Sequence, residues 1–488
     1  MRKLLLGGLC FFSTISFYAN GQTMVVNSTA DGGRSELQAL ADQGKITLRY
    51  AIQYSTARDV VKFDASLAGD TIVLTRGSAV QFLSPNTRTL LVDGEDMNVT
   101  ISGGSLQQIF FIEDTQTEML DVTIRNLKFI NGKSDGDGTT GGANGGAILN
   151  AEKLTIENCI FENNNARIPG ATAYGGAVAV AKAGGMLTVK NSLFRNNSVS
   201  GVGGAVGADV AGSMAVIENC VFIDNRATWL GGGVGINWNI TAEMYNNTFY
   251  NNSSLFNGGG CALYDSKTTI GGNLFLSNTA GGGVKNGVTL PIVTEDLYAY
   301  YAWAGTFNDI GYNVYEANLV FLERETNANK ITPYTWASLS RKTTLGASGI
   351  LTLNNGVKGG YFLTDVGNTE TRIVPQSFIS NKADLAVDIS GVSRSGSLNY
   401  NAGAKEYTLN SGLVNPQAKY GELKFFPNPV KDILYFVEPV HSKVELLSID
   451  GKILYSAENI ISLDMRKYNQ GVYILRTNNT LSKVIKIK

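Results

Sequence analysis

The sequence predicts an all-β protein: a parallel β-helix (a solenoid) followed by a small C-terminal β-sandwich. Three observations predict this class. A motif recurs through the middle of the chain every 26 to 33 residues, a period typical of repeat architectures in which each repeat forms one turn. Glycine is abundant, at 56 of 488 residues, whereas proline occurs only 9 times. Residues 425–488 read as short alternating strands separated by turn residues.

Residues 1–21 have the order of parts found in a secretory signal peptide. Arg2 and Lys3 precede an apolar stretch over 4–18, and Ala19-Asn20-Gly21 forms a small-x-small cleavage site. The mature chain is therefore expected to start at Gln22. No later segment has 18 uninterrupted apolar residues, so we expect no transmembrane helix.

The composition narrows the classes of function. The chain has 40 Lys and Arg against 41 Asp and Glu, a net charge of −1, which argues against a nucleic-acid partner. With His441 as the single histidine and no C-x-x-C motif, we expect no metal site and no cofactor. Three cysteines remain once the signal peptide is removed, too few for a disulfide framework.

The central repeat, over residues 121–290, is anchored on a phenylalanine. The residue five positions earlier is apolar every time, and the residue three positions earlier is Asn or Gly. The phenylalanines are Phe129, Phe161, Phe194, Phe222, Phe249 and Phe275. The asparagines are Asn126, Asn158, Asn191, Asn219 and Asn246, with Gly272 in the last repeat.

Side-chain parity predicts a turn at this asparagine. In a continuous strand, residues five positions apart point to opposite faces of the sheet. The phenylalanine would then point away from the core, so the chain must bend between the two apolar positions. Asn and Gly tolerate the positive φ that such a bend requires. The five asparagines are expected to stack as a turn ladder, and a second Asn column, three residues after each phenylalanine, is expected to mark the next bend.

A glycine pair opens a further corner of each repeat, at Gly145, Gly175, Gly203, Gly231 and Gly258. A phosphate-binding loop would need Lys-Ser/Thr and a helix after the glycines. Strand-like segments follow instead, so we interpret these glycines as tight corners where neighbouring turns approach closely.

The paired GGA[IV] and F-x-x-N motifs resemble the repeats of chlamydial polymorphic outer-membrane proteins and of secreted bacterial right-handed β-helix proteins. The segments at 46–55 and 388–407 are similar to the opening and closing segments of that family. The resemblance implies a right-handed β-helix with an N-terminal cap and first coils over 22–120, and C-terminal coils with an aromatic-rich capping region over 291–414. It implies an adhesin-like or carbohydrate-associated surface protein and supplies no catalytic residues.

Residues 425–488 contain PNP, then DGK, then YxxGVY with Met465 where the motif LxxYxxGVY has its Leu, and a basic last strand, in the sequence MRKYNQGVYILRT…KVIKIK. This order resembles the type A sorting domain of type IX secretion in Bacteroidota, with residues 415–424 as a linker. The alternative is a fibronectin-like accessory module. The resemblance implies that the type IX secretion machinery is a partner and that the protein is secreted or held at the outer cell surface.

Candidate chemistry lies on the outer faces of the coils. Arg125, Glu157, Lys190 and Glu218 alternate in sign on successive coils, which favours ion pairing between strands over catalysis. A glycosidase needs two carboxyls in one groove. Asp209 and Asp265 could supply them, but the sequence does not single them out, so no catalytic residue is named.

Four aromatic residues are candidates for contact with a ligand. Trp229 and Trp238 lie on the glycine-corner side of the coils, and Tyr301 and Trp303 lie in an aromatic run over 298–336. Tyr and Trp suit sugar faces because they are apolar with a polar edge, but this run could equally cap the open end of the solenoid. The sequence therefore favours an adhesive or structural protein that binds a glycan or a protein partner, with a polysaccharide lyase or glycoside hydrolase as the alternative.

The three remaining cysteines are expected to be free. Cys159 and Cys220 each lie two residues before their phenylalanine, with Ser192 on the coil between them. Two coil steps separate them by about 9.6 Å, beyond the ~7 Å that a disulfide spans. Cys261 lies in a glycine corner and should also be free.

Overall fold

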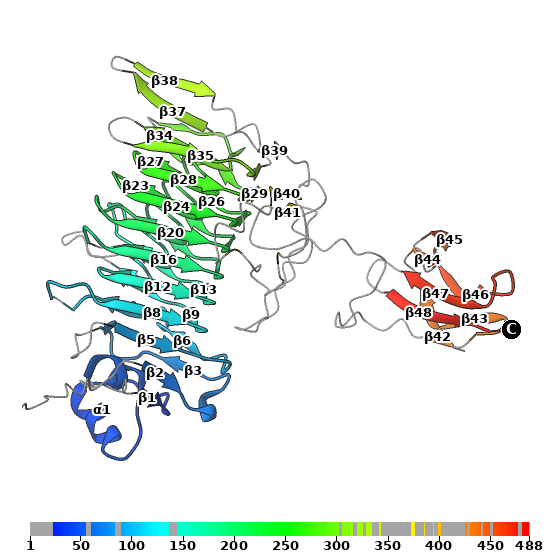
Figure 1. Cartoon of the computed structure of the whole chain (residues 1–488), viewed down its shortest axis with the longest axis horizontal. Helices are drawn as coiled ribbons and strands as arrows, with labels where there is room; N and C mark the ends of the chain where they lie inside the picture. Colours follow the sequence, from blue (N-terminus) through cyan, green and yellow to red (C-terminus); the bar gives the residue numbers. More distant parts are fainter. Residues whose placement is uncertain are drawn as a thin grey trace, which may run out of the picture. The chain divides into compact units, whose positions relative to one another are not determined.

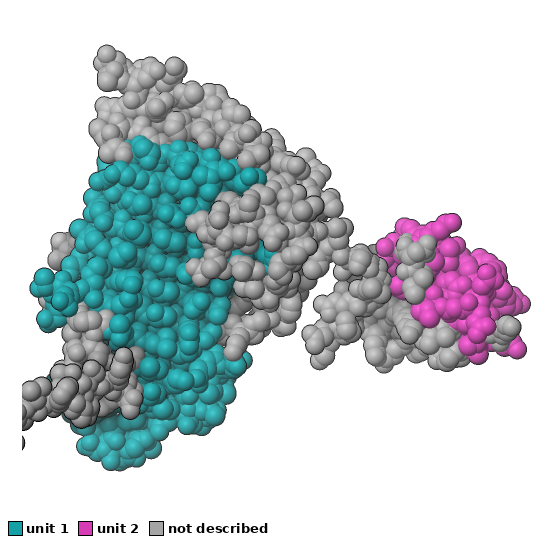
Figure 2. Space-filling view, viewed as in Figure 1, with its two compact units in different colours: residues 1–407 teal, residues 408–488 magenta. Residues whose placement is uncertain are grey.

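The computed structural model divides the chain into two compact units, residues 1–407 and 408–488 (Figure 2), which are described separately. The residues described are 23–54, 60–82, 89–114, 116–135, 144–180, 182–285, 287–301, 305–315, 320–325, 328–333, 341–342, 372–375, 385, 394, 399–401, 425–426, 430–440, 443–448, 452–476 and 481–487. The predicted signal peptide, the 415–424 linker and Trp303 lie outside them.

The first unit is a parallel β-helix whose coils stack strand upon strand (Figure 1). Each complete coil runs through four sheets in the order 1, 2, 3, 4. Sheet 1 contains β1 (Thr23–Val26), β2 (Val60–Phe63), β5 (Thr89–Asp93), β8 (Asp121–Arg125), β12 (Lys153–Glu157), β16 (Met186–Lys190), β20 (Met214–Glu218), β24 (Thr241–Tyr245), β28 (Lys267–Gly271) and β35 (Thr306–Asp309). Sheet 2 contains β3 (Thr71–Val73), β6 (Thr100–Ser102), β9 (Lys128–Ile130), β13 (Ile160–Glu162), β17 (Leu193–Arg195), β21 (Val221–Ile223), β25 (Thr248–Tyr250), β29 (Leu274–Leu276), β36 (Val314–Tyr315) and β39 (Arg341–Lys342).

Sheets 3 and 4 complete the coil. Sheet 3 contains β10 (Lys133–Asp135), β14 (Asn165–Arg167), β18 (Ser198–Val199), β22 (Arg226–Ala227), β26 (Ser253–Ser254), β30 (Thr279–Ala280) and β33 (Val293–Thr294). Sheet 4 contains β4 (Val80–Gln81), β7 (Phe110–Ile112), β11 (Ile148–Asn150), β15 (Val178–Val180), β19 (Val206–Ala208), β23 (Val234–Asn237), β27 (Cys261–Tyr264), β34 (Leu297–Tyr301), β37 (Val320–Glu325) and β38 (Ala328–Pro333). β33 and β38 pair antiparallel to their neighbours. Two further hairpins pair β31 (Val284–Lys285) with β32 (Val288–Thr289) and β40 (Arg372–Pro375) with β41 (Asn399–Asn401).

The predicted phenylalanine column forms the centre of the core. The six rings pair in register between adjacent strands of sheet 2 and all are fully buried. Successive rings stack nearly parallel, with centroids 4.7 to 5.0 Å apart. The repeat in the sequence is therefore a column of direct contacts, because identical residues meet at every coil step.

The asparagines before the phenylalanines form the bend between sheets 1 and 2. All five have φ between 49° and 59°, and Gly272 has φ of 67°. Side-chain hydrogen bonds join Asn158 to Asn126 at 3.4 Å and Asn219 to Asn191 at 2.6 Å. Within the described part of the chain the amide of Asn246, although buried, has no hydrogen-bond partner.

The second Asn column does not form the bend that the sequence analysis assigned to it. The residues with positive φ lie one position earlier: Asn131, Asn163, Asn196, Asp224, Asn251 and Ser277. The asparagines of the column itself point inward and form a continuous amide ladder through Asn164, Asn197, Asn225, Asn252 and Asn278 to Asp296, with Nδ2–Oδ1 distances of 2.9 to 3.0 Å. Since a carboxylate accepts hydrogen bonds without needing an acceptor of its own, Asp296 satisfies the last amide.

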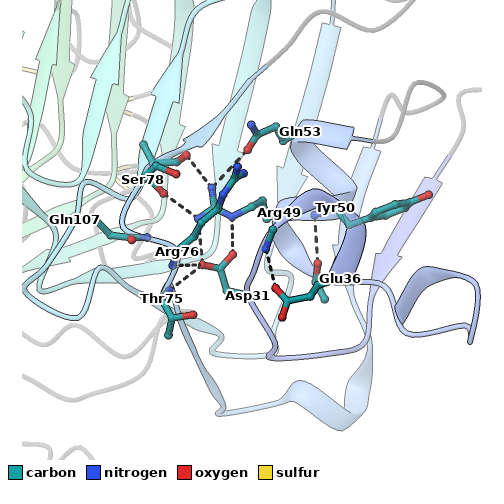
Figure 3. Close-up of polar contacts among 12 residues, drawn as sticks. Asp31, Glu36, Arg49, Tyr50, Gln53, Thr75, Arg76, Ser78 and Gln107 are labelled. Atoms are coloured by element: carbon teal, nitrogen blue, oxygen red, sulfur yellow. Dashed lines mark hydrogen bonds and ion pairs between the residues drawn. The ribbon is translucent and has the colours of Figure 1, made fainter. Parts of the chain in front are cut away.

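A buried ion pair closes the N-terminal end of the solenoid. The helix α1 (Arg34–Ala41) and the π-helical turn η1 (Tyr50–Tyr54) cover the first coil, and a 3-10 turn η2 (Ala65–Leu67) follows β2. Arg49 donates to Asp31 and to the carbonyls of Ser78 and Ala79, while the backbone N–H groups of Thr75 and Arg76 donate to Asp31 (Figure 3). Both side chains are almost fully buried. Although burial opposes it, the Arg49 guanidinium and these N–H groups hold the pKa of Asp31 below its usual value.

Part of the predicted closing segment lies against the turn column. Arg394 is 2% exposed and donates to Asn219 Oδ1 at 3.1 Å and to the Leu385 carbonyl at 3.2 Å. Leu385 is fully buried. The chain therefore returns to coils that lie more than 150 residues earlier in the sequence.

The second unit is a small antiparallel β-sandwich, as predicted. One sheet contains β42 (Phe425–Phe426), β43 (Ile433–Val440) and β46 (Ile460–Asp464), and the other contains β44 (Val444–Leu447), β45 (Ile453–Ala457), β47 (Gly471–Arg476) and β48 (Leu481–Lys486). Buried side chains from both sheets form one core, including Leu434 and Leu463 from the first sheet and Leu446, Leu475 and Val484 from the second.

Candidate functional site

The outer face of sheet 4 is partly covered by the chain that leads into each glycine corner. Tyr174, Val202, Leu230 and Asn257 form a column of bridges between adjacent coils. Glycine in sheet 4 permits this close approach: a Cβ at Gly207 would lie 2.3 Å from the Gly175 nitrogen, and one at Gly235 would lie 2.3 Å from Val202 Cγ1. Val202 and Leu230 pack with Ala262 and Tyr298 into a small apolar cluster separate from the main core.

Beside this cluster, outward-facing residues form a second column along the solenoid axis. Asn237, Tyr264 and Tyr300 pair in register on β23, β27 and β34. Asp209 follows Ala208, which pairs with Ile236, so it neighbours Asn237 on the preceding coil. This column changes from polar to aromatic along the axis, and Tyr264 and Tyr300 pack against the apolar cluster.

Three aromatic residues lie in or next to this column: Tyr264 and Tyr300 are half-buried, and Trp238, which follows Asn237, is exposed. Trp238 has a positive φ of 48°, which turns the chain just after β23. Its side chain is 41% exposed, and its ring centroid lies 5.2 Å from that of Tyr264. The Tyr264 ring in turn stacks on Tyr300 at 4.6 Å. The result is an aromatic surface that extends over three neighbouring coils.

The polar end of the column is a cluster of Tyr174, Asp209 and Asn237. Burial raises the pKa of Asp209 above its ordinary value and outweighs the opposing effect of the neighbouring Tyr174 and Asn237 side chains. Burial also raises the pKa of Tyr174, and its bond to Asp209 raises it further. We call these three residues, with Trp238, Tyr264 and Tyr300, the sheet-4 site.

Two oxygen atoms of this cluster lack partners. Among the residues that the structure describes, Asp209 Oδ1 and Asn237 Oδ1 are buried side-chain oxygens with no hydrogen bond. Asn237 as a whole is 2% exposed. Unsatisfied buried polar atoms are uncommon in folded proteins and each has a free-energy cost. Both atoms are acceptors that the surrounding protein encloses, so they are not part of the surface that a bound molecule would contact.

The four aromatic residues named from sequence do not form one group. Trp238 belongs to the sheet-4 site. Trp229 is 43% exposed but lies on the segment before Leu230, where its backbone N–H donates to the Gly201 carbonyl. Tyr301 ends β34, and neither its side chain nor Trp303 is among the described parts of the structure.

A separate hollow of about 620 Å³ lies at the bend between sheets 1 and 2, and its lining is acidic. It is lined by Asp93, Glu95, Asp96, Met97, Arg125, Asn126, Glu157 and Asn158. Asp93 pairs with Arg125 at 2.8 Å, and Glu95 pairs with Lys62 at 2.5 Å. Hydrogen bonds from Arg125 and Asn126 outweigh burial and lower the pKa of Asp93. These charges therefore stabilise the first coils.

The outward charges of sheet 2 are also paired. Glu162 accepts from Lys128 on one side, at 2.8 Å, and from Arg195 on the other. On sheet 1, Lys153 pairs with Asp121 at 2.5 Å. Asp265 is buried and accepts a hydrogen bond from the backbone N–H of Gly305 at 3.1 Å. This contact is structural.

The described residues contain neither a group of three or more potential metal ligands nor a helix long and apolar enough to cross a bilayer. Cys159, Cys220 and Cys261 are free and buried, as predicted. Burial raises the pKa of the Cys159 thiol to about 12 and also raises those of Cys220 and Cys261.

Comparison with known families agrees with this architecture. Residues 90–290 match a family model described as "Right handed beta helix region". Residues 424–487 match one described as "Secretion system C-terminal sorting domain". The first unit is thus a right-handed parallel β-helix. The sorting domain indicates export by type IX secretion to the cell surface or the exterior. The resemblance to chlamydial repeats and the Bacteroidota origin stay predictions.

No curated protein matches the chain in sequence. Among solved structures, a doubly substituted variant of pectate lyase from Xanthomonas campestris is similar over 78% of this chain and 96% of its own, with 12% identity and a TM-score of 0.30. At that TM-score the likeness supports no inference about the site or its activity.

Most of the sheet-4 site was not predicted from the sequence, although one signal for it was present. Asp209, Asn237 and Tyr264 each lie six residues after the glycine that opens their corner, at Gly203, Gly231 and Gly258. Aligning the repeats on this glycine would have placed them in one column. Tyr174 has no such signal, because it reaches Asp209 from the segment folded over the sheet.

Proposed function

We propose that this chain is a secreted or surface-displayed adhesive protein that binds a glycan through the sheet-4 site. Export rests on the match to the sorting domain, and cleavage of residues 1–21 as a Sec signal is part of the proposal. The observation that supports glycan binding is the exposed Trp238 ring, continued by Tyr264 and Tyr300 along the axis. Such rings offer apolar faces to the C–H groups of a sugar.

The polar cluster gives the site the second element that sugar binding needs. Aromatic faces provide contact area, and a few buried polar groups fix the orientation of a ligand. Asp209, which is half-buried, neighbours Asn237, the residue before Trp238. A protein partner is the alternative occupant of this surface.

The enzyme alternative, a polysaccharide lyase or glycoside hydrolase, has less support. A lyase or hydrolase would gather unpaired charged groups in a groove beside the ligand. The acidic hollow has no aromatic side chain in its lining, and its Asp93 and Glu95 are in ion pairs. In the sheet-4 site Asp209 is the one carboxyl of the six residues that define it.

A matched pair of tryptophan variants tests the proposal. The mature chain, Gln22–Lys488, is screened on a glycan array, and affinities for the glycans it binds are measured for Trp238→Ala and Trp229→Ala. The two side chains have similar exposure, so Trp229→Ala controls for loss of an exposed ring. We expect Trp238→Ala to weaken binding at least tenfold, about 1.4 kcal/mol, and Trp229→Ala to leave it unchanged.

Three results would overturn this proposal. Wild-type protein that binds no glycan would remove it, as would equal losses in the two variants. Release of unsaturated or reducing sugar ends from a bound glycan would place the chain among the enzymes.

A further inference from the structure

We propose that the hairpin of β31 and β32, with the apolar residues around its base, is a lipid-binding surface that docks the protein on a membrane. The inference goes beyond glycan binding and does not depend on the sheet-4 site. Four aliphatic side chains are exposed within ten residues of sequence: Val284 (61%), Val288 (65%), Ile292 (72%) and Val293 (47%). Single exposed apolar residues are common on folded proteins, whereas a continuous exposed patch marks contact with a partner or a membrane.

The hairpin stands out from the solenoid. Val284 pairs with Thr289 in it, and the two strands form a sheet of their own, outside the four sheets of the coils. At the turn, Gly287 has a φ of 79°. A Cβ placed there would meet no atom of the described structure within 4 Å. The end of the hairpin therefore lies in open solvent.

Apolar side chains lie on both faces of this hairpin. Residues directly opposite each other in an antiparallel pair share a face, and successive residues of one strand alternate between faces. Because Val284 is opposite Thr289 and Val288 is opposite Lys285, the two valines lie on different faces. Both are more than half exposed. A folded protein partner would cover one face of the hairpin and leave the other in water, whereas a lipid phase surrounds both.

The apolar surface continues from the base of the hairpin onto the two preceding coils. A Cβ at Gly283 would lie 2.9 Å from Cζ of Phe256, so this ring lies directly against the base. The backbone N–H of Phe256 donates to the Trp229 carbonyl of the coil before it, at 3.2 Å. Trp229 is exposed, and tryptophan is enriched where proteins meet the boundary between lipid and water. We call the following residues the hairpin patch: Trp229, Phe256, Val284, Val288, Ile292 and Val293.

Charge and size favour a lipid surface over a second copy of the chain. Residues 281–294 contain Lys285 and no acidic residue, which suits the attraction of membrane-bound segments to anionic lipids. A stable protein interface takes about 20–30 residues a side, many more than the hairpin patch contains. The sorting domain indicates export to the cell surface or the exterior, so a membrane is available to the exported chain.

Flotation of the mature chain with vesicles tests the proposal. One set of vesicles is phosphatidylcholine alone, and the other is phosphatidylcholine mixed with phosphatidylglycerol. Neither contains a sugar, so the sheet-4 site does not contribute. We expect the chain to bind both sets and to bind the anionic set more tightly, with the difference reduced by salt because Lys285 is then screened.

A triple variant and a matched control assign the binding to the hairpin. Val284→Thr, Val288→Thr and Ile292→Thr together keep β-branched side chains and make them polar. All three positions are exposed, so the midpoint of urea unfolding should not change. Binding should weaken at least tenfold, because it scales with the apolar area buried in the lipid. The control combines Val73→Thr with Leu106→Thr, which are exposed aliphatic positions on other coils, and should bind like wild type.

A fluorescent label reports whether the hairpin enters the lipid. Thr289 is exposed on β32, and Cys159, Cys220 and Cys261 are buried. A thiol-reactive, environment-sensitive dye on the native Thr289→Cys variant should therefore label this position alone. We expect its emission to shift to the blue and increase when vesicles are added, because the dye leaves water for an apolar environment.

Four results would overturn the proposal. The chain could fail to float with either set of vesicles, or the triple variant and the control could lose binding equally. Emission from the label that does not respond to vesicles would place the hairpin outside the lipid. Self-association in lipid-free buffer, measured by sedimentation velocity and abolished in the triple variant, would show that the hairpin patch binds a second copy of the chain instead.

Discussion

The inward amide ladder should be a main source of stability for the central coils, and Asn197 is the position to test. Its Oδ1 accepts from the backbone N–H and from Nδ2 of Asn164, both at 3.0 Å. Its Nδ2 donates to the Phe161 carbonyl and to Asn225 Oδ1, both at 3.0 Å. The side chain is fully buried, so water cannot replace these bonds.

Asn197→Leu keeps the approximate shape of the side chain and removes all four bonds. Three groups lose a partner: the Asn164 N–H, one Asn164 amide hydrogen and the Phe161 carbonyl. Asn225 Oδ1 keeps the bond from the Asn197 backbone N–H. An unsatisfied buried group costs about 1–3 kcal/mol. After allowance for the apolar surface gained, the variant should lose roughly 3–6 kcal/mol of unfolding free energy.

Asn196→Gly is the matched control. Asn196 is the adjacent asparagine, is exposed and has a φ of 54°, a conformation that glycine adopts without strain. It should change the unfolding free energy by less than about 1 kcal/mol.

Urea unfolding of the mature chain, followed by tryptophan fluorescence, measures the difference. Trp229 and Trp238 lie within two coils of Asn197 along the stack and report on this part of the solenoid. A transition midpoint for Asn197→Leu that equals that of Asn196→Gly would refute the claim that the ladder stabilises the core.

Two further predictions concern titratable groups in the first unit. Burial, followed by the charge of Asp296, raises the pKa of Glu295 to about 7 from 4.5, against the opposing bonds from Gly258 and Asn257. Because the folded state then favours the protonated form, its contribution to stability is lost as pH rises from about 4.5 to 7. Wild type should lose roughly 3 kcal/mol relative to Glu295→Gln across that range in unfolding titrations, and parallel pH profiles would contradict this. For the cysteines, Ellman titration of the mature chain at pH 8 without reductant should detect no thiol in the native state and three after denaturation; fewer than three would indicate a disulfide and contradict the coil register.

The sequence was sufficient for the solenoid because its register is a property of the repeat. Phe161 pairs with Phe194, and Phe194 with Phe222, in the structure, just as they align in sequence. In a parallel solenoid each residue meets the equivalent residue of the next coil, so an alignment of repeats is already a contact map. The bend at Asn191 was predictable for the same reason, since parity requires it and asparagine tolerates its φ of 49°.

The second bend shows where this reasoning ends. Asn196 and Asn197 are neighbours of the same type, and sequence alone does not decide which one takes the positive φ. The structure places Asn196 in the bend and turns Asn197 inward. Packing decides this, because only the inward residue can bond to Asn164 and Asn225 across the coils.

The sheet-4 site depends on tertiary structure in a stronger sense. Repeat alignment can place Asp209, Asn237 and Tyr264 in one column, because that column lies within the register. Tyr174 reaches Asp209 only because its segment folds back over the outer face of sheet 4, where Gly207 leaves room for the backbone at Gly175. Whether a side chain on that face is buried or exposed depends on the segment that folds over it. The periodicity of the sequence carries no information about that segment.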